Sequence, residues 1–253
     1  MSFVRGTSAV RRMRVAFAVT LAGAIGAACG SDTAPKTPSE LDGAGVPVGG
    51  GTASAYVVQG PNGPTAIGVK LTPGALTGLP SADSMWALPM PAGVTVPAYD
   101  HVMLNWNAQG HPPAPYMVPH FDFHFYMISA AEQAAIQGGP DTVTVAPQFV
   151  PADYMSGVMS VPDMGVHWVD SLSAEFTGHP FDRTFIYGFS KGSMVFVEPM
   201  VTQAYLASQP DAVANVKQPQ AWQIHGNFPM QYSVKTDPGT KDVRVELDSL
   251  VAR

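Results

Sequence analysis

Hydrophobic and polar residues alternate with a period of two in several stretches of the chain, which predicts half-buried β-strands. The alternation is clear over residues 67–71 and again over 243–248 near the C-terminus. Aromatic and β-branched residues fill 184–189 and 193–197, on either side of Ser190-Lys191-Gly192. These two runs predict a hairpin with a short glycine-bearing turn.

Helical signals are few and short. Ser129-Ala130-Ala131-Glu132 has the pattern of a capping box and predicts a helix as far as Gln137, where Gly138-Gly139-Pro140 ends it. A second short helix is predicted over Val201–Ala207. Strands separated by Pro and Gly, with two or so short helices, predict a mainly β fold: an antiparallel sandwich or barrel.

The composition agrees with a folded, weakly charged domain. Hydrophobic residues make up 46% of the 253 residues, which excludes disorder of the whole chain. Charged residues make up 13%, about half the usual share, so long ion-paired helices and basic nucleic-acid arms have few residues to form from. The 25 Gly and 24 Pro indicate many turns.

A positive leader and an uncharged apolar run open the chain. The arginines precede the run from Val15 to Ala28, and Cys29 follows directly. This is the layout of an export signal, and the run is shorter than the roughly 20 residues that span a bilayer. The alternatives are a short anchor or buried helix, and a cysteine that ends the leader by chance. Arg11-Arg12 leaves the export route, Sec or twin-arginine, open.

The residues around Cys29 resemble a bacterial lipoprotein cleavage box, with Gly26 where such boxes usually have an aliphatic residue. We therefore predict a signal peptide over residues 1–28 and an acylated Cys29 that holds the exported protein in the bacterial cell envelope. Gly, Pro and Ser dominate residues 29–51, which predicts a flexible tether. A single β-rich domain is expected over residues 52–253.

Loss of the leader would remove four of the 13 Lys and Arg, leaving nine against 19 acidic residues and a net charge of −10. Nucleic acid and anionic headgroups are therefore not expected as partners, because both bind clustered cations. The acyl chain is the one membrane attachment predicted, and the sequence leaves homo-oligomerisation open.

Candidate chemistry is concentrated in the run from His120 to Tyr126, which alternates perfectly. On a strand, His120, Asp122 and His124 share one face, and three phenylalanines share the other. Imidazole and carboxylate ligands suit zinc, iron, manganese or copper, and zinc is the ion we expect. Positions four apart on a strand are about 13 Å apart, so one ion reaches both histidines only if the strand bends, whereas Asp122 can pair with either.

Such an ion needs ligands from other segments. His167 is the preferred distant ligand, and further candidates are His111, His101 and Glu198. As an enzyme, the protein would be a metal-dependent hydrolase or oxygenase, with Asp122 or Glu198 as a general base toward metal-bound water. As a non-enzyme, it would sequester metal or serve assembly. Two metal-free alternatives are an ordinary solvated strand face and a polar ligand pocket.

Residues 188–192 match the G-x-S-x-G pattern of serine hydrolases. That motif requires a strand, a sharp turn and then a helix, whereas Ser193 opens a further strand-like run. His225 is the sole histidine downstream. We therefore predict that Ser190 lies in a hairpin turn and is not a nucleophile.

Several short strings resemble a family of exported bacterial proteins of unknown function that is named for a Thermus open reading frame. The strings are Tyr99-Asp100-His101, Asn105-Trp106-Asn107, Gly110-His111, the run His120–Tyr126, Met164-Gly165-Val166-His167-Trp168 and Phe196-Val197-Glu198-Pro199-Met200. The similarity covers most of residues 55–250, with Pro112 where the family often has an acidic residue. The resemblance implies an extracytoplasmic, β-rich domain, and it transfers no catalytic residue because the family has no established activity.

Overall fold

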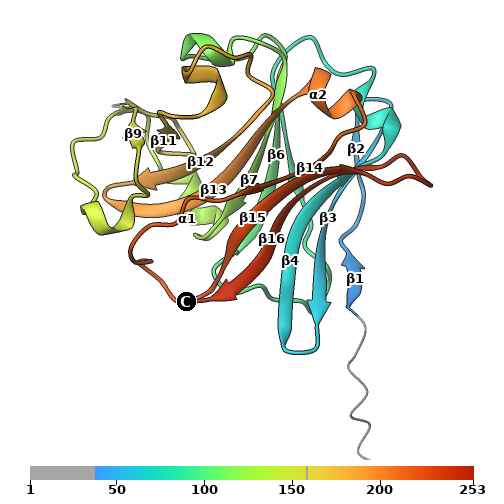
Figure 1. Ribbon diagram of the computed structural model, residues 1–253, viewed down its shortest axis with the longest axis horizontal. Coiled ribbons are helices and arrows are strands. Elements are labelled where there is room, and N and C mark those ends of the chain that lie inside the picture. The colour runs from blue at the N-terminus through green and yellow to red at the C-terminus, as the bar shows by residue number, and fades with distance from the viewer. Residues whose placement is uncertain (1–37, 158) are drawn as a thin grey trace, which may run out of the picture. The chain divides into compact units, whose positions relative to one another are not determined.

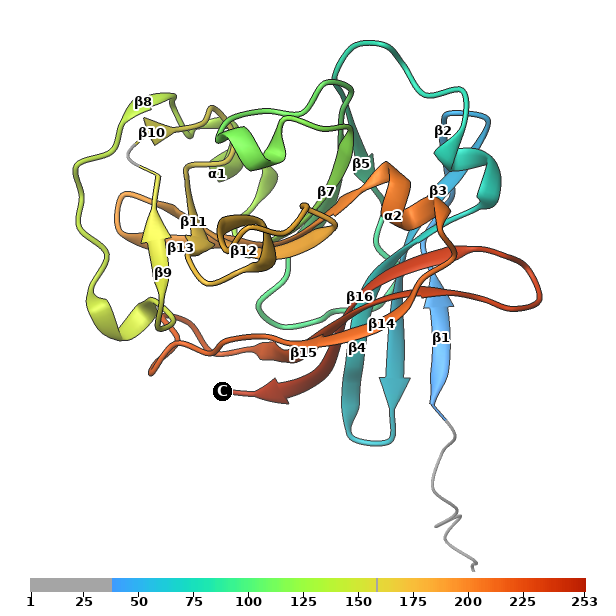
Figure 2. The same cartoon turned by 45° about the horizontal axis from the view of Figure 1, so that its top comes forward.

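Two seven-stranded sheets face each other in the computed structural model, which describes residues 38–157 and 159–253. All strand pairs between neighbours are antiparallel. The first sheet has the order β1-β3-β4-β16-β15-β14, with β2 also paired to β3, and the second has the order β5-β6-β7-β13-β12-β11-β9 (Figures 1 and 2). The predicted antiparallel fold is confirmed as a sandwich, and the described residues form no closed barrel.

The strands of the first sheet are β1 (Ser39–Asp42), β2 (Val46–Val48), β3 (Gly51–Gly60), β4 (Gly63–Leu71), β14 (Asp211–Asn215), β15 (Asn227–Thr236) and β16 (Val243–Ala252). Those of the second are β5 (Ser84–Leu88), β6 (His101–Asn107), β7 (His120–Tyr126), β9 (Tyr154–Ser156), β11 (Val166–Asp170), β12 (Arg183–Ser190) and β13 (Ser193–Thr202). A small pair, β8 (Gly139–Pro140) and β10 (Met159–Ser160), lies outside both sheets.

The main core fills the space between the sheets. The predicted strand at residues 67–71 is part of β4, and Ile67 and Val69 are fully buried. Phe121, Phe123 and Phe125 project into the same core from β7 and are also fully buried. The period-two pattern therefore identified the buried face of each strand correctly.

The predicted hairpin is confirmed: β12 and β13 pair along their length and are joined by Lys191-Gly192. Both turn residues have positive φ, 50° and 80°, as a two-residue type I′ hairpin turn requires. Ser190 pairs with Ser193 at the hairpin end, so the strand–turn–helix geometry of a serine hydrolase does not form here.

Both predicted helices are present but shorter than expected. Helix α1 (Ala130–Ala134) begins at the Ser129 cap, whose hydroxyl accepts from the Glu132 N–H while the Glu132 carboxylate accepts from the Ser129 N–H. Helix α2 (Gln203–Ala207) is capped by Thr202, so Val201 belongs to β13. The described residues also contain four short 3₁₀ helices: η1 (Pro73–Leu76), η2 (Ala114–Tyr116), η3 (Pro147–Phe149) and η4 (Ala174–Phe176).

The predicted flexible tether is wrong for its C-terminal part, because residues 39–51 contain β1, β2 and the start of β3. Strand β1 pairs with β3, and Lys70 forms ion pairs with Glu40 and Asp42. The segment Ser39–Asp42 has no apolar face of its own. Its position is set by pairing with the edge of β3 and by these ion pairs. Residues 29–37, like the predicted signal peptide and Cys29, lie outside the described residues.

A second layer covers the outer face of the second sheet. The segment between β6 and β7 lies there together with the elements α1, β8 and β10, and Figure 2 shows α1, β8 and β10 on the side of β12 and β13 away from β15. Val145, Phe149 and Val150 pack against the main core instead. The second layer encloses a second apolar cluster that includes Tyr116, Tyr126, Ile136, Ile186 and Phe196. This cover decides the environment of the histidine face of β7.

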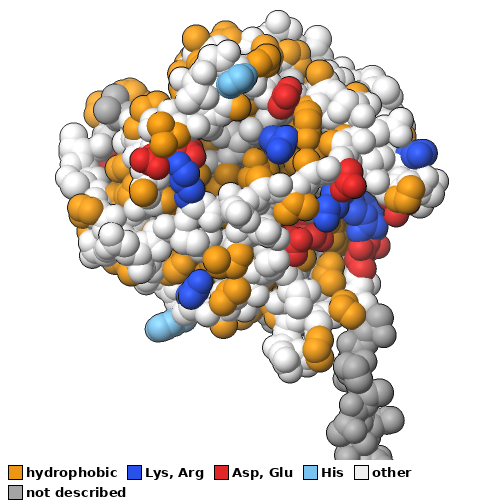
Figure 3. Space-filling view, in the orientation of Figure 1, with side chains coloured by type: hydrophobic (Ala, Val, Ile, Leu, Met, Phe, Trp, Pro, Cys, Tyr) orange, Lys and Arg blue, Asp and Glu red, His pale blue; other side chains and the backbone are white. Residues whose placement is uncertain are grey.

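The face in Figure 3 is largely uncharged, with a few small clusters of mixed charge. In the part of the chain that the structure describes, no helix has the length and apolarity needed to cross a membrane.

Candidate metal centre

Strand β7 lies in the middle of the second sheet, between β6 and β13. His120, Asp122 and His124 project from its outer face, as predicted, but their side chains are 0–5% exposed. The solvated-face alternative is therefore wrong, because the outer layer excludes water from this face. Buried imidazoles and carboxylates need partners, so the question becomes what satisfies them.

The structure divides the polar side chains on this face into two groups. The His111 group consists of His111, His120 and Asp122, and the Glu198 group consists of His124, His167 and Glu198. Within each group, one ligand atom from every residue lies within 4.8 Å of the others.

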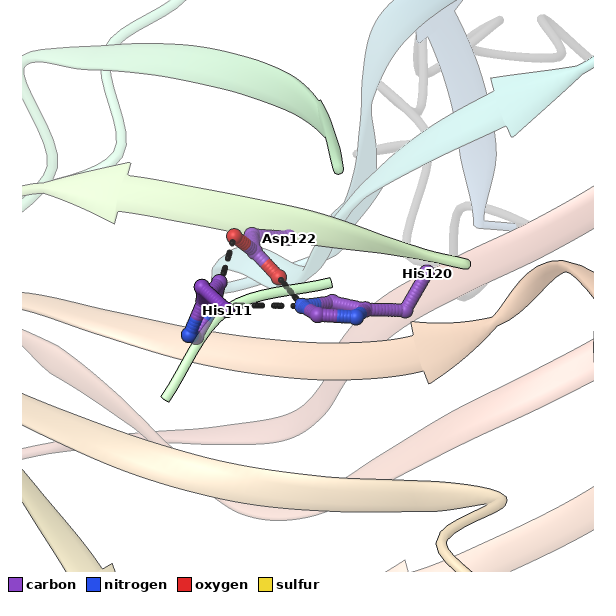
Figure 4. A group of neighbouring side chains, drawn as sticks. All are labelled: His111, His120 and Asp122. Carbon is purple, nitrogen blue, oxygen red and sulfur yellow. Dashed lines mark hydrogen bonds and ion pairs between the residues drawn. The ribbon is translucent and has the colours of Figure 1, made fainter. Parts of the chain in front are cut away.

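In the His111 group, a loop brings His111 against β7, as Figure 4 shows. Gly110 makes the loop tight: its φ is +70°, and a Cβ there would lie 2.1 Å from the Tyr116 carbonyl oxygen. The His111 backbone N–H donates to that same carbonyl at 3.2 Å. The side chain of His111 is 34% exposed, whereas His120 is fully buried, so the group is open on the His111 side.

Backbone contacts fix the tautomers of both imidazoles. His120 Nδ1 lies 2.7 Å from the Val118 carbonyl and His111 Nδ1 lies 2.9 Å from the Pro112 carbonyl. A carbonyl only accepts, so both Nδ1 atoms carry hydrogen and both Nε2 atoms of the neutral rings present lone pairs. These two Nε2 atoms are 3.1 Å apart, and Asp122 Oδ1 is also 3.1 Å from His120 Nε2. Three acceptors therefore face one another. Asn107 Nδ2 lies 3.2 Å from His120 Nε2 and can donate to it, but Asp122 Oδ1 has no hydrogen bond among the described residues, so an added proton or a metal ion would stabilise the group.

Asp122 is held from several sides. Asn107 Nδ2 donates to Asp122 Oδ2 at 2.6 Å, and His111 Nε2 lies 3.7 Å from that oxygen. Burial raises the pKa of Asp122, but the hydrogen bonds and charges of His111 and His120 outweigh it and hold that pKa well below its usual value. Burial likewise lowers the pKa of His111, yet Asp122 outweighs this and the net pKa is raised. An ionised Asp122 next to a cation is the favoured state.

The Glu198 group is assembled from three strands. The register that pairs Val197 with Phe125 and Met200 with Asp122 places Glu198 of β13 opposite His124 of β7. On β11, His167 pairs with Gly188 of β12. A Cβ on Gly188 would lie 2.2 Å from the Phe196 ring, so glycine is what allows that ring to lie across β12.

The Phe196 ring forms one wall of the Glu198 group. Its centroid lies 4.7 Å from that of His124 and 5.3 Å from that of His167. His124 and His167 have their Nε2 atoms 3.7 Å and 3.6 Å from the same Glu198 oxygen, Oε2. Gly188 and Phe196 thus place the two imidazoles on either side of one carboxylate.

Polar atoms in the Glu198 group lack partners. Among the described residues, both ring nitrogens of His124 and both carboxylate oxygens of Glu198 are buried without a hydrogen bond. Burial lowers the pKa of His124 to about 3 and of His167 to about 4, and burial together with Asp122 raises the pKa of Glu198. Both imidazoles are therefore neutral, the form in which histidine binds metals, and Glu198 would ionise on binding a cation.

The spacing of the ligand atoms in both groups is close to that of a zinc site. Bonds of 2.0–2.1 Å in tetrahedral geometry separate the ligand atoms by about 3.3 Å. In the His111 group, His120 Nε2 lies 3.1 Å from both His111 Nε2 and Asp122 Oδ1, and His111 Nε2 lies 3.7 Å from the other Asp122 oxygen, Oδ2, so all three distances are close to this value. Those in the Glu198 group, 3.6 and 3.7 Å, require a contraction of a few tenths of an ångström. Both donor sets fit a divalent transition metal, with three ligands and an open position.

A cavity of about 690 Å³ adjoins both groups and is lined by His111 and Asp122 of the first and His167 of the second. Its size is within the range of small-molecule sites. Most of the remaining lining is apolar, and it includes Tyr116, Met155, Met164, Val169, Phe176 and Ile186.

The four residues predicted to share one ion, His120, Asp122, His124 and His167, are thus brought to one region but divided two and two. Of the further candidates, His111 and Glu198 complete the two groups, whereas His101 bonds to Asp100 and Gln133 instead. His179 and His225 are exposed. Asn107, Gly188 and Phe196 were not recognised as site residues. Nothing local to their sequence marks them, because their roles arise from cross-strand neighbours.

Comparison with known families found one match. Residues 62–106 match the TTHB210-like family, described as hypothetical protein TTHB210. The predicted resemblance is confirmed over this segment, which contains β4 and β5 and extends to Trp106 in β6. The TTHB210-like match stops before His111, so it carries none of the six possible ligands. Neither the curated proteins nor the solved structures yielded a match.

Proposed function

We propose that the protein binds a divalent transition metal, zinc by preference, in the His111 group, with a second position in the Glu198 group. The observation that carries the proposal is the meeting of His111 Nε2, His120 Nε2 and Asp122 Oδ1, three acceptors with His120 Nε2 only 3.1 Å from each of the other two. Asn107 Nδ2 contacts His120 Nε2 and Asp122 Oδ2, which leaves Asp122 Oδ1 without a hydrogen bond among the described residues. Backbone carbonyls occupy both Nδ1 atoms, an arrangement typical of metal-binding histidines.

A proton on His111 would also relieve the repulsion among these acceptors, so the Glu198 group provides the independent support. Its polar atoms have neither a proton donor nor water-facing surface on the His124 and Glu198 side. Leaving buried polar atoms unbonded costs about 1–3 kcal/mol each. A metal ion bound by all three residues would remove that cost for the atoms that coordinate it.

Elemental analysis of the full-length purified protein tests the proposal, together with the melting temperature measured with and without chelator. Bound zinc or another transition metal is expected, and chelation should lower the melting temperature because metal binding couples to folding. Asp122→Ala should lower metal content, while His179→Ala, at an exposed histidine outside both groups, should not. A wild type that binds no metal when supplied with zinc would refute the proposal.

A second candidate function, a metal-dependent hydrolase or oxygenase, is favoured by the cavity next to both groups. Three protein ligands leave a coordination position for water or substrate, as in catalytic zinc and non-haem iron sites. A bound metal would supply an activated water. The carboxylate that does not bind that ion would accept the proton: Glu198 when the ion is in the His111 group, or Asp122 when it is in the Glu198 group.

We further propose that the domain is held at the bacterial cell envelope by an acylated Cys29, with no nucleic-acid partner. The apolar run that ends at this single cysteine supports the proposal. Mass spectrometry of membrane-fraction protein should show a lipid adduct at Cys29, and Cys29→Ser should release the protein. An ordinary amino terminus on a soluble wild type would contradict it.

A further inference from the structure

The cavity next to the two groups has a polar end and an apolar body. His111, Asp122 and His167 lie at the polar end. Met164, Val169 and Ile186 are among the apolar residues that line the rest. Its volume of about 690 Å³ is far larger than an ion and its water ligands need. The body of the cavity is therefore large enough to hold an organic ligand beside the ion.

The charges around the cavity restrict that occupant. Among the described residues that line it, none is Lys or Arg. An anionic ligand thus has no protein cation to pair with except His111, which is already engaged with Asp122. A polyanion such as a nucleotide or a sugar phosphate is excluded on this ground. A single anionic or strongly donating group is acceptable only if the metal binds it.

We propose that the cavity binds a small amphiphile, a medium-length apolar chain or aromatic body that ends in one oxygen-donor group such as a carboxylate or hydroxamate. The donor group coordinates the metal ion of the His111 group, so this inference rests on the proposed function. The body lies against the apolar lining, and Met155 on the edge strand β9 stands at the rim with 43% exposure. Unbranched, polarisable methionine side chains suit a ligand surface that adapts to its guest.

Isothermal titration calorimetry on the zinc-loaded full-length protein tests the inference. Octanohydroxamate and acetohydroxamate carry the same metal-binding group and differ in chain length alone. Each methylene that becomes buried strengthens binding about fourfold, so octanohydroxamate should bind at least 100-fold more tightly than acetohydroxamate. Octanol, which has the chain without the strong donor, should bind weakly and independently of metal.

A pair of matched variants tests where the alkyl chain of the ligand binds. Met155→Glu should weaken octanohydroxamate binding about tenfold, because it places a charge at the apolar rim, and should leave acetohydroxamate unchanged. Met85→Glu is the control: Met85 is 55% exposed on β5, the opposite edge strand of the same sheet, and does not line the cavity. It should change neither affinity.

The outcomes separate the inference from the proposed function. Bound zinc with no chain-length dependence, or an equal effect of both glutamate variants, overturns the inference and leaves metal binding intact. A protein that takes up no zinc overturns the proposed function and the coordination of the donor group. Octanol binding that is weakened by Met155→Glu would then still support an apolar cavity ligand.

Discussion

The two faces of β7 are equally buried but differ in how their atoms are satisfied. On the inner face, Phe121, Phe123 and Phe125 have no polar atoms and lie in an apolar core. On the outer face, His124 is just as inaccessible, yet neither of its ring nitrogens has a hydrogen bond within the described residues. Burial therefore does not distinguish a structural face from a functional one, whereas unsatisfied polar atoms do.

The difference implies that the two faces contribute to stability in different ways. The inner face stabilises the fold under all conditions, because apolar burial needs no cofactor. The outer face is costly until a cation joins it, so its contribution should depend on metal. The following predictions test that contrast, from the largest expected effect to the smallest.

Phe123→Ala should lower the free energy of unfolding by about 3–5 kcal/mol, because it removes a fully buried ring from the main core. Urea denaturation with and without chelator should give the same loss, since the inner face does not contact the metal groups. A loss that appears only with metal present would show that the two faces are coupled.

Gly188→Ala should lower the free energy of unfolding by about 1–3 kcal/mol, because its Cβ would lie 2.2 Å from the Phe196 ring. Displacement of that ring should also weaken metal binding in the Glu198 group. Gly45→Ala is the control, since its Cβ would have no neighbour nearer than 3.7 Å, the Cβ of Thr52. Metal titration followed by denaturation measures both effects, and equal behaviour of the two variants would contradict the role given to Phe196.

His124→Leu should raise the free energy of unfolding in the presence of chelator by about 1 kcal/mol, because it replaces unbonded polar atoms with an apolar group. With zinc present, the same variant should lose most of the metal-dependent rise in melting temperature. Destabilisation in chelator would mean that His124 has a structural partner, and the face would then resemble an ordinary polar core.

Glu40→Gln should lower the free energy of unfolding by less than about 1 kcal/mol, since its ion pairs with Lys70 and Arg244 are partly exposed. Partial burial raises the pKa of Glu40, but Arg244 and Lys70 outweigh this and the net pKa lies below the ordinary 4.5. The contribution is therefore complete at neutral pH and is lost as the pH falls through that lowered pKa. Denaturation at a series of pH values should show the largest difference between variant and wild type at pH 7, and the difference should shrink as the pH falls below 4.5.

The sequence predicted the two faces of β7 because alternation is a local property of a strand. Strand spacing also indicated that His120 and His124 could not share an ion on a straight strand, and the structure divides them accordingly. The partners of each histidine could not be derived in the same way. Glu198 faces His124 through the register of β7 with β13, and His111 arrives on a loop that only Gly110 allows.

Two other features depended on tertiary contacts that no local pattern records. From the sequence, the outer face of β7 could also be interpreted as solvated, because the layer that buries it comes from loops and helices outside that strand. Strand β1 was missed because Ser39–Asp42 has no apolar periodicity, and its order comes from β3 and Lys70.

The six possible ligands are spread from residue 111 to residue 198, and strands β7 and β13 become neighbours only when the second sheet forms. An unfolded chain therefore has no such site, and an ion can be bound only after the chain has folded. If the leader directs an unfolded chain through the Sec route, the metal pool outside the cytoplasm supplies the ion. If the leader directs a folded chain through the twin-arginine route, the protein can bind an ion from the cytoplasmic metal pool before export.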